Sequence, residues 1–456
     1  MLFERVPCDA LAQSCYVIAS AGEALVVDPM RDVEEVLAIC RRHDLRIRHV
    51  VATHVHADYI SGLWELAAAT DAQIGLGARF AGTLPCSRLQ DEDELAVGEL
   101  NVRVLATPGH TPESICLYVP DEDPEAAARL LSGDTLFVGD VGRPDLTSSA
   151  GHDADSMALQ LYASLRGALL DLPDNTMVWP AHGAGSMCGG AIRAAANSTL
   201  ATERRQNWAL QEQEPADFCR RLIGSLKEAP AYFDRVARQN LTGAPMLASL
   251  AEAEAISSDD VPGSLAAGST MLDVRSVKDY GNSHWHTAVH ISIDEGEFES
   301  WAGALLPAAP VILHARDRQQ ALEAQRRLRR VGHDEVSGSV LSTPDEASAL
   351  RQIDAIDLFG AQRPWQVVDV RTPSEFADGH LEGALPWPLA ADMQRRLPKG
   401  LDRTMPTALV CEGGYRSSAA ASLLADLGLI EVANVRDGMP GWRRNHLPLS
   451  RDDAAD

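Results

Sequence analysis

The sequence lacks the features that would mark a secreted or membrane protein. Its eight cysteines include no Cys-x-x-Cys pair, and eight in a chain of 456 residues do not form a disulfide framework. No apolar run approaches the roughly 18 residues that indicate a membrane span. Glu4 and Pro7 interrupt the start of the chain, where a signal peptide requires an apolar stretch. We therefore expect a cytoplasmic protein with no membrane partner, whose first residues form a strand.

Basic residues are scarce relative to acidic ones. The 40 lysines and arginines against 65 aspartates and glutamates give a formal net charge of −25. Such a charge favours solubility and self-repulsion. The negative net charge argues against a nucleic-acid partner, which requires a basic face. It is compatible with local basic pockets that bind a small anion.

The length predicts about three domains. Residues 1–250 mix β-rich runs with stretches of helical spacing, and the acidic segment 251–264 reads as a linker. Two further units follow, at 264–345 and 353–456. Within the first unit the pattern predicts strands at 15–18, 24–28, 49–53, 102–105, 114–119 and 177–179, and helices at 33–42, 155–170 and 190–212.

The last two units repeat one another. Asp273-Val274-Arg275 recurs as Asp369-Val370-Arg371, an offset of 96 residues (369 minus 273). The alternation of strand and helix in each copy predicts a parallel sheet. The same offset, without a gap, relates four more pairs: His284 and His380, Pro310 and Pro406, Gly332 and Gly428, and Val336 and Val432.

The two copies differ where chemistry is expected. Cys411 opens a glycine-rich turn, and its counterpart is Ala315. Gly413 and Gly414 allow backbone N–H groups to converge on one point, and a helix beginning near Ser417 adds positive potential there. A thiolate or persulfide at Cys411 is therefore expected to be stabilised. The copy with Ala315 has no nucleophile, so we call residues 264–345 the silent copy and residues 353–456 the active copy.

Histidines and acids stand at the ends of four apolar runs within residues 1–250. His54, His56 and Asp58 follow the strand predicted at 49–53, and residues two apart on extended chain point to the same side. Loops at strand ends are where a rigid sheet collects ligands, so we predict a metal site there. The other three runs, each beside glycine or proline, end in His110, Asp134 and His182.

Residues 1–210 resemble the metallo-β-lactamase family. The resemblance implies an α/β fold in which helices enclose two sheets, an αββα sandwich, with metal bound at one edge. Hydrolases of that fold carry H-x-H-x-D-H and bind two metals, whereas this chain has Tyr59 at the last position. A phenol is a poor zinc ligand beside imidazole, so the second metal position loses a ligand.

Two histidines and one carboxylate with open positions are typical of non-haem Fe(II) oxygenases. The branch of the family with that chemistry is the persulfide dioxygenases. By this resemblance His54, His110 and Asp134 would bind one Fe(II) per chain. Four more residues would line the site without binding iron: His56, Asp58, Tyr59 and His182.

Two neighbouring segments carry further candidates. Arg143 and Asp145 resemble part of the Gly-Arg-x-Asp segment of the same enzymes, and we interpret the pair as a structural brace, with neutralisation of an anionic substrate as the alternative. Cys188 lies in a glycine-rich loop before the helix predicted at 190–212, where backbone donors favour a thiolate. It is either a packed small residue or a thiol that relays sulfur near the iron.

Residues 358–449 resemble the rhodanese family, which carries one sulfur atom on a loop cysteine. The resemblance implies that Cys411 is catalytic, and that the silent copy, with Gln320 in place of Arg416, keeps only the fold. The Glu412 carboxylate beside the thiol is expected to repel anionic donors such as thiosulfate. The loop comprises Cys411, Glu412, Gly413, Gly414, Tyr415 and Arg416.

The order of the three units resembles bacterial fusion proteins that detoxify sulfide-derived persulfides. It predicts a persulfide dioxygenase with sulfurtransferase activity, whose partners are a small-molecule thiol persulfide, O2 and sulfite, with thiosulfate as product. Two alternatives stay open: a zinc-dependent, glyoxalase II-like thioesterase with attached rhodanese modules, and a non-catalytic sulfur-relay scaffold. We expect a homo-oligomer, with the silent copy as a candidate interface.

Overall fold

The computed structural model describes residues 1–123, 126–147 and 151–451. The chain divides into two compact units, the first of residues 1–250 with 329–332, the second of residues 251–328 with 333–456. The two copies thus share one unit. Within the described ranges, no helix has the length and apolar character needed to cross a membrane.

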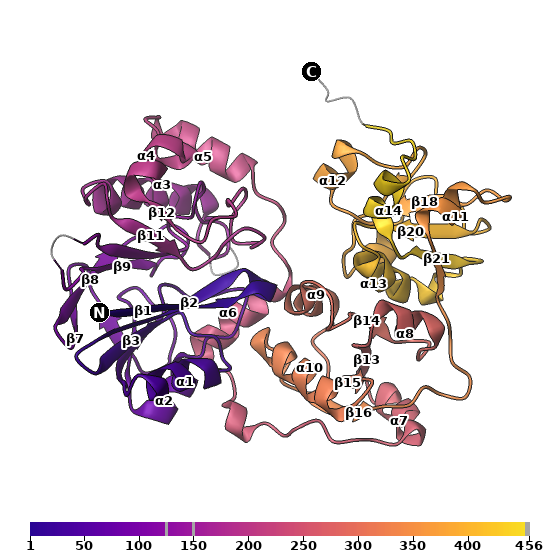
Figure 1. Ribbon diagram of the computed structural model, residues 1–456, viewed down its shortest axis with the longest axis horizontal. Coiled ribbons are helices and arrows are strands. Elements are labelled where there is room, and N and C mark those ends of the chain that lie inside the picture. Colours follow the sequence, from indigo (N-terminus) through magenta and orange to yellow (C-terminus); the bar gives the residue numbers. More distant parts are fainter. Residues whose placement is uncertain (124–125, 148–150, 452–456) are drawn as a thin grey trace. The chain divides into compact units, whose positions relative to one another are not determined.

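Two six-stranded sheets form the centre of the first unit (Figure 1), in the orders β1-β2-β3-β4-β5-β6 and β12-β11-β10-β9-β8-β7. The first sheet contains β1 (Leu2–Cys8), β2 (Gln13–Ser20), β3 (Glu23–Val27), β4 (Arg46–Val51), β5 (Gln73–Gly77) and β6 (Ser87–Leu89). The second contains β7 (Glu94–Val97), β8 (Leu100–Ala106), β9 (Ile115–Val119), β10 (Arg129–Gly133), β11 (Met177–Pro180) and β12 (Ser198–Thr199).

Helices cover the outer faces of both sheets, which gives the four-layer αββα arrangement that the sequence predicts. Because successive residues of a strand face opposite sides, Leu25 and Val27 of β3 pack between the sheets while Ala24 and Val26 pack under helices. The helices of this unit are α1 (Glu34–Arg42), α2 (Leu63–Thr70), α3 (Ala154–Ser164), α4 (Leu200–Gln206), α5 (Pro215–Gly224) and α6 (Tyr232–Thr242).

The prediction of a helix at 190–212 is wrong for its first part. Helix α4 begins only at Leu200. Before it, the backbone N–H groups of Gly190 and Ala191 donate to the Asp140 carboxylate at 2.8 and 2.6 Å. A side-chain acceptor that binds successive backbone donors competes with helix formation, so this segment is a loop.

The second unit holds two parallel sheets, with strand orders β14-β13-β15-β16 and β17-β21-β20-β18-β19. The strands are β13 (Thr270–Asp273), β14 (Val289–His290), β15 (Val311–His314), β16 (Val336–Val340), β17 (Arg351–Ile353), β18 (Gln366–Asp369), β19 (Leu385–Pro386), β20 (Thr407–Val410) and β21 (Val432–Val435). The helices are α7 (Val261–Ala266), α8 (Val277–Asn282), α9 (Phe298–Leu305), α10 (Arg318–Arg330), α11 (Ala355–Phe359), α12 (Pro373–Asp378), α13 (Tyr415–Leu423) and α14 (Gly438–Arg444).

The duplication is visible in individual contacts. Arg275 donates to Asp273 at 3.0 and 2.6 Å, and Arg371 donates to Asp369 at the same distances. In both copies a histidine stacks on an aromatic ring one helical turn earlier, with centroids 3.8 Å apart: His284 on Tyr280, and His380 on Phe376. The prediction that the silent copy keeps the fold is therefore confirmed at the level of hydrogen bonds.

The acidic segment at 251–264 is not a free linker. The Ile256 N–H donates to the Ser339 carbonyl at 2.9 Å, and the Ser339 N–H donates to the Glu254 carbonyl at 2.7 Å. Ala255 thereby forms a parallel bridge at the edge of the silent sheet. Its counterpart at the 96-residue offset is Arg351, the first residue of β17, so this segment is a remnant of the same edge strand.

Candidate metal site and sulfur-transfer loop

The predicted ligands of the first unit come together at one edge of the two sheets. His54 follows β4, His110 follows β8, and Asp134 comes directly after β10. Their ligand atoms all lie within 4.8 Å of one another, and all three side chains are buried. The Asp134 Oδ2 atom is 3.6 Å from the His54 Nε2 atom and 3.4 Å from the His110 Nε2 atom. We call these three residues the triad.

Each triad histidine is held through its other ring nitrogen. The His110 Nδ1–H donates to the Arg143 carbonyl at 2.8 Å. The Thr53 hydroxyl donates to Asp28 at 2.8 Å, so its oxygen accepts from the His54 Nδ1–H at 3.0 Å. Second partners of this kind fix the tautomer of a metal-binding histidine. Both Nε2 atoms are left buried and without a hydrogen-bond partner among the described residues, which is the arrangement that a metal ion completes.

The protonation states also suit a metal. Burial lowers the pKa of His54 well below its ordinary value and also lowers the pKa of His110, so both imidazoles are neutral. Burial alone would raise the pKa of Asp134, but the adjacent charged His182 holds it well below its usual range. Neutral imidazoles and an ionised carboxylate are the forms that bind a metal.

His182 lies beside the triad between two acids. Its Nδ1 atom is 2.7 Å from Asp134 and its Nε2 atom is 2.9 Å from Asp58. Burial disfavours the charged form, yet the two carboxylates raise the pKa of His182 well above its ordinary value. Both nitrogens of a protonated imidazole are donors, so in this state His182 has no lone pair for a metal.

His56 and Tyr59 stack on each other, with ring centroids 4.3 Å apart. The His56 Nε2–H donates to Asp28 at 3.0 Å, which leaves its Nδ1 atom buried and without a partner among the described residues. The Tyr59 hydroxyl accepts from Gln13 at 3.1 Å and donates to the Asp28 carbonyl at 3.3 Å. Burial raises the pKa of Tyr59 well above its ordinary value, so the phenol is neutral and is held by other partners.

Asp28 is the functional residue that the sequence reasoning missed. Its carboxylate accepts from the Thr53 backbone, the Thr53 hydroxyl and the His56 ring. It directly follows β3 with a φ of 52°, a backbone region that most residues avoid. The available signal was an acid at the end of an apolar run, the same pattern that identified Asp134.

Arg143 and Asp145 form the brace that the sequence interpretation favours. Two guanidinium nitrogens of Arg143 donate to the two Asp145 carboxylate oxygens at 2.7 and 2.8 Å. Arg143 is 3% exposed and also donates to the carbonyls of Met187 and Lys227. With these donors engaged, its backbone carbonyl is fixed where it accepts from His110.

Of the two alternatives for Cys188, a packed small residue and a reactive thiol, the structure favours the packed residue, because the side chain is buried. Burial, with Asp58 and Asp134 nearby, raises the pKa of Cys188 well above its ordinary value. No helix begins at Cys188, because the adjacent backbone donors bind Asp140 instead. The Cys188 sulfur does lie within 4.8 Å of ligand atoms of Asp58 and His182, so its role as a sulfur relay stays a prediction.

A cavity of about 600 Å³ opens over the loops that carry the triad. Val55, which lies between two of the site histidines, and Glu113, three residues after His110, both line it. Its charged groups are two arginines, Arg79 and Arg238, and two acids, Glu113 and Asp234. The cavity is thus large enough for a small molecule bound beside the loops that hold the triad.

The active loop of the second unit surrounds the Cys411 sulfur with donors. The Gly414 N–H donates to the Cys411 Sγ atom at 3.1 Å. The Ser417 hydroxyl lies 3.2 Å from the sulfur and 2.6 Å from the Asn434 Oδ1 atom, and its single hydrogen can be donated to either acceptor. Gly414 has a φ of 82°, and a Cβ atom there would collide with the Arg436 carbonyl, so glycine is required. This is the convergence of donors that the sequence predicts.

The charged residues of the loop are paired with opposite charges outside it. Arg416 donates to both carboxylate oxygens of Glu375 at 2.8 and 2.7 Å, and this hydrogen bonding lowers the pKa of Glu375 to about 2. The Glu412 carboxylate accepts from Arg443 at 2.8 Å. Glu412 is therefore partly neutralised, and its expected repulsion of anionic donors is weaker than the sequence alone indicates.

The silent loop is built differently. Ala315 is fully buried, and the Arg316 N–H donates to the Gln320 side chain at 2.9 Å. The Gln320 N–H in turn donates to Asp317 at 2.8 Å. Donors that could face a sulfur at position 315 are thus already used by side chains.

We expect Ala315→Cys to add a thiol without adding a sulfur carrier. Thiosulfate output should stay within about twofold of the wild type, because no donor cradle surrounds position 315. Thiol titration of the unfolded chain should count nine cysteines instead of eight. Thiosulfate formation by the double variant Ala315→Cys, Cys411→Ser would contradict this expectation.

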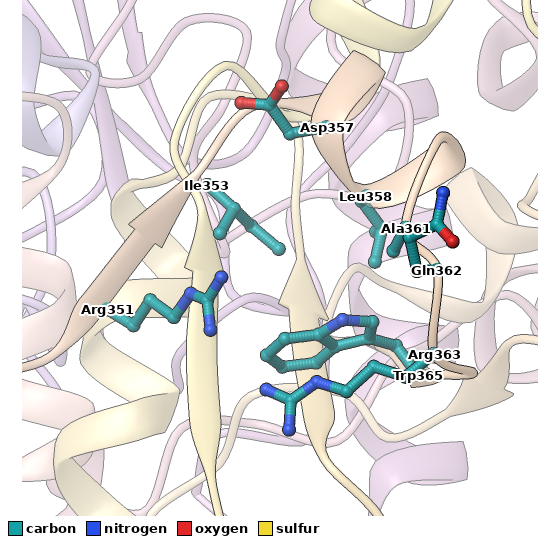
Figure 2. Close-up of a pocket in the computed structure, with 8 residues that line it drawn as sticks. All are labelled: Arg351, Ile353, Asp357, Leu358, Ala361, Gln362, Arg363 and Trp365. Atoms are coloured by element: carbon teal, nitrogen blue, oxygen red, sulfur yellow. The ribbon is translucent and has the colours of Figure 1, made fainter.

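A second hollow lies on the active copy, and Figure 2 shows its lining. Arg351 and Arg363 flank the Trp365 ring at 5.4 and 5.1 Å, and both pair with Glu431. Arg351 begins β17 and Trp365 precedes β18, whereas Cys411 follows the end of β20. Starts and ends of parallel strands lie at opposite edges of a sheet, so these arginines are not part of the Cys411 site.

Two family models match the chain, one in each compact unit. The family model of the metallo-beta-lactamase superfamily matches residues 8–182, which contain the triad. The model of the rhodanese-like domain matches residues 351–445, which contain Cys411. The two matches fall in different compact units, so the chain combines two families.

Individual relatives point to the same superfamily. A solved metallo-beta-lactamase from Staphylococcus aureus subsp. aureus COL is 31% identical, covers 75% of this chain and 98% of its own, and has a TM-score of 0.65. An uncharacterised protein of Aquifex aeolicus is 30% identical over 203 residues, 40% of this chain and 90% of its own length. A hydroxyacylglutathione hydrolase of Anaeromyxobacter dehalogenans is 36% identical over 168 residues, 37% of this chain and 60% of its own length. The chain belongs to the metallo-beta-lactamase superfamily and carries a rhodanese-like domain in its C-terminal part.

Proposed function

We propose that the chain is a persulfide dioxygenase coupled to a sulfurtransferase. The observation that carries this proposal is the triad, in which two unpartnered Nε2 atoms and one carboxylate converge while Tyr59 is held by Gln13. Such a set fits one ion with open positions for O2 and a substrate sulfur. Fe(II) in this set would supply the redox chemistry that reduction of O2 requires.

The dioxygenase reaction converts a thiol persulfide, O2 and water into the free thiol, sulfite and protons. One O2 and one water supply the three oxygen atoms of sulfite, and the S–S bond of the persulfide breaks. The triad would orient the terminal sulfur, and the cavity beside it would hold the rest of the molecule. Arg79 and Arg238 in that cavity would pair with carboxylates of the thiol, beside the lining acids Glu113 and Asp234.

The transferase reaction uses the second unit. The Cys411 thiolate attacks the terminal sulfur of a second persulfide and releases its thiol, which leaves a persulfide anion on Cys411. Sulfite then attacks that terminal sulfur, so thiosulfate leaves and the Cys411 thiolate is restored. The Gly414 N–H donates to the sulfur anion before and after transfer, and the Ser417 hydroxyl, which also bonds to Asn434, lies within reach of it.

A thioesterase is the second candidate, and two observations favour it. One relative is named hydroxyacylglutathione hydrolase. The buried Nδ1 atom of His56 has no partner among the described residues and is a free nitrogen that zinc would accept. Against it stands Tyr59, whose hydroxyl is occupied by Gln13 and Asp28.

Metal content and O2 uptake decide between these functions. Protein purified without oxygen should contain about one iron per chain, as three ligands for one ion require. With a low-molecular-weight persulfide it should consume one O2 for each sulfur oxidised. Zinc-loaded protein that hydrolyses S-lactoyl thiols and consumes no O2 would be a thioesterase, and protein that does neither would be a scaffold.

A further inference from the structure

The silent copy binds the helix that cradles Cys411. His290 is the last residue of β14 in the silent sheet and is fully buried. Its backbone N–H donates to the Ser422 hydroxyl at 2.9 Å, and its ring Nδ1 atom lies 2.8 Å from the Ser418 hydroxyl. Ser418 and Ser422 are four residues apart on α13 and therefore lie on one face, one turn above the other. One residue of the silent copy thus holds two successive turns of α13.

The direction of these hydrogen bonds is fixed by the third partner of His290. Its Nε2 atom is 3.1 Å from the Arg275 carbonyl, and a carbonyl can only accept, so Nε2 carries the hydrogen. Burial lowers the pKa of His290 to about 4, so the ring is neutral near pH 7. Nδ1 therefore accepts from the Ser418 hydroxyl.

The contacts of Ser418 and Ser422 with His290 fix the rotation of α13 about its axis, and this rotation determines where Ser417 points. Neighbouring residues of an α-helix are about 100° apart around the axis. Ser418 faces the silent copy, whereas the Ser417 hydroxyl lies 3.2 Å from the Cys411 Sγ atom and 2.6 Å from the Asn434 Oδ1 atom. If α13 rotated about its axis, Ser417 and the Gly414 N–H would lose their aim at the sulfur, and both bonds to His290 would break.

This contact is not a by-product of the duplication. At the 96-residue offset the counterpart of His290 is Pro386, which has no N–H and no ring nitrogen to accept a hydrogen bond. The counterparts of Ser418 and Ser422 are Leu322 and Arg326. All three residues are therefore unlike their counterparts, which fits a contact that belongs to the pairing of the two copies.

We propose that His290 is a positioning residue for sulfur transfer: it fixes the rotation of α13 through Ser418 and Ser422 and so aims the donors at Cys411. The silent copy is then a working part of the active site, although it has no nucleophile. This rests on the proposed role of Cys411 as sulfur carrier.

The test measures the Cys411 thiol itself in the full chain. Iodoacetamide alkylation of the Cys411 peptide is followed by mass spectrometry from pH 5 to pH 10 in His290→Gln, Ser418→Ala and His290→Asn. Asparagine places an acceptor near the Nδ1 position, whereas glutamine does not. We expect His290→Gln and Ser418→Ala to react about tenfold more slowly at pH 7 and to need a higher pH, and His290→Asn to stay within about twofold of the wild type.

Two comparisons separate positioning from loss of stability. The double variant His290→Gln, Ser418→Ala should be no slower than either single variant, because both remove one interaction. His284→Gln is the matched control, since His284 is buried in the silent copy and stacks on Tyr280, as His290 does. It should lower the melting temperature without changing the alkylation profile.

Either of two results would overturn the proposal: a wild-type profile in His290→Gln and Ser418→Ala, or equal slowing by His284→Gln. Failure of the proposed function looks different. If the wild type makes no thiosulfate but its alkylation profile still depends on His290, the sulfurtransferase role falls and the positioning role stands.

Discussion

Cys411→Ser is expected to abolish thiosulfate formation while O2 consumption continues. A serine hydroxyl at this position keeps the contact with the Gly414 N–H, so the loop should fold. It cannot carry a sulfane sulfur, and removal of a catalytic nucleophile lowers the rate by about a thousandfold or more. The triad lies in the other compact unit, so persulfide oxidation should proceed and sulfite should accumulate in place of thiosulfate.

The measurement is the amount of sulfite and thiosulfate formed for each O2 consumed. Cys219→Ser serves as the control, because Cys219 is a buried thiol of helix α5 that belongs to neither site, and its loss should leave the thiosulfate fraction unchanged. If Cys411→Ser still makes thiosulfate, another residue carries the sulfur. If Cys411→Ser stops consuming O2, persulfide oxidation depends on sulfur transfer. A separate outcome concerns Cys188: if Cys188→Ser accumulates sulfite, the Cys188 thiol has a relay role.

The two histidines of the H-x-H pattern are expected to differ sharply. His54→Gln removes a triad member, and iron should fall from about one per chain to less than about a tenth, with loss of O2 consumption. His56→Gln should retain iron, because the His56 ring is bound to Asp28 and stacked on Tyr59. Loss of such an outer partner typically costs about 10- to 100-fold in affinity or activity.

Elemental analysis and O2 uptake of both variants, side by side, provide the measurement. Both residues are buried and two positions apart, so a general loss of folding would affect them alike. Cys411 alkylation checks that the second unit is intact in each variant. Equal loss of metal in His54→Gln and His56→Gln would contradict the triad and would favour a zinc site that uses His56.

Short-range patterns determined much of the fold and of the candidate site. The apolar run predicted as a strand at 49–53 is enough to place His54 at the sheet edge, because β4 ends at Val51 and the residues that follow a strand lie at the end of the sheet. The exact 96-residue offset predicts that both copies share a fold, and matched contacts such as Arg275–Asp273 and Arg371–Asp369 follow from it. The glycines after Cys411 predict the convergence of donors for the same local reason.

Long-range contacts decided the rest. Asp28 organises His56 from 28 residues away in sequence, and His182 is bound to Asp58 across 124 residues. The local loop of Cys188 favours a thiolate, but distant acids and burial keep the thiol protonated. Each of these environments depends on groups that meet only when the sheets pack.

The sequence by itself determined that one copy has a cysteine at the loop position and that the other copy is silent, because the presence of a nucleophile is a property of a single position. Only the tertiary structure decided how the silent copy meets the active one. The contact between His290 and Ser418 joins residues 128 positions apart, and no periodicity or motif in either segment marks it. A hydrogen bond between two packed elements depends on their relative position, which the packing of both copies around one core fixes.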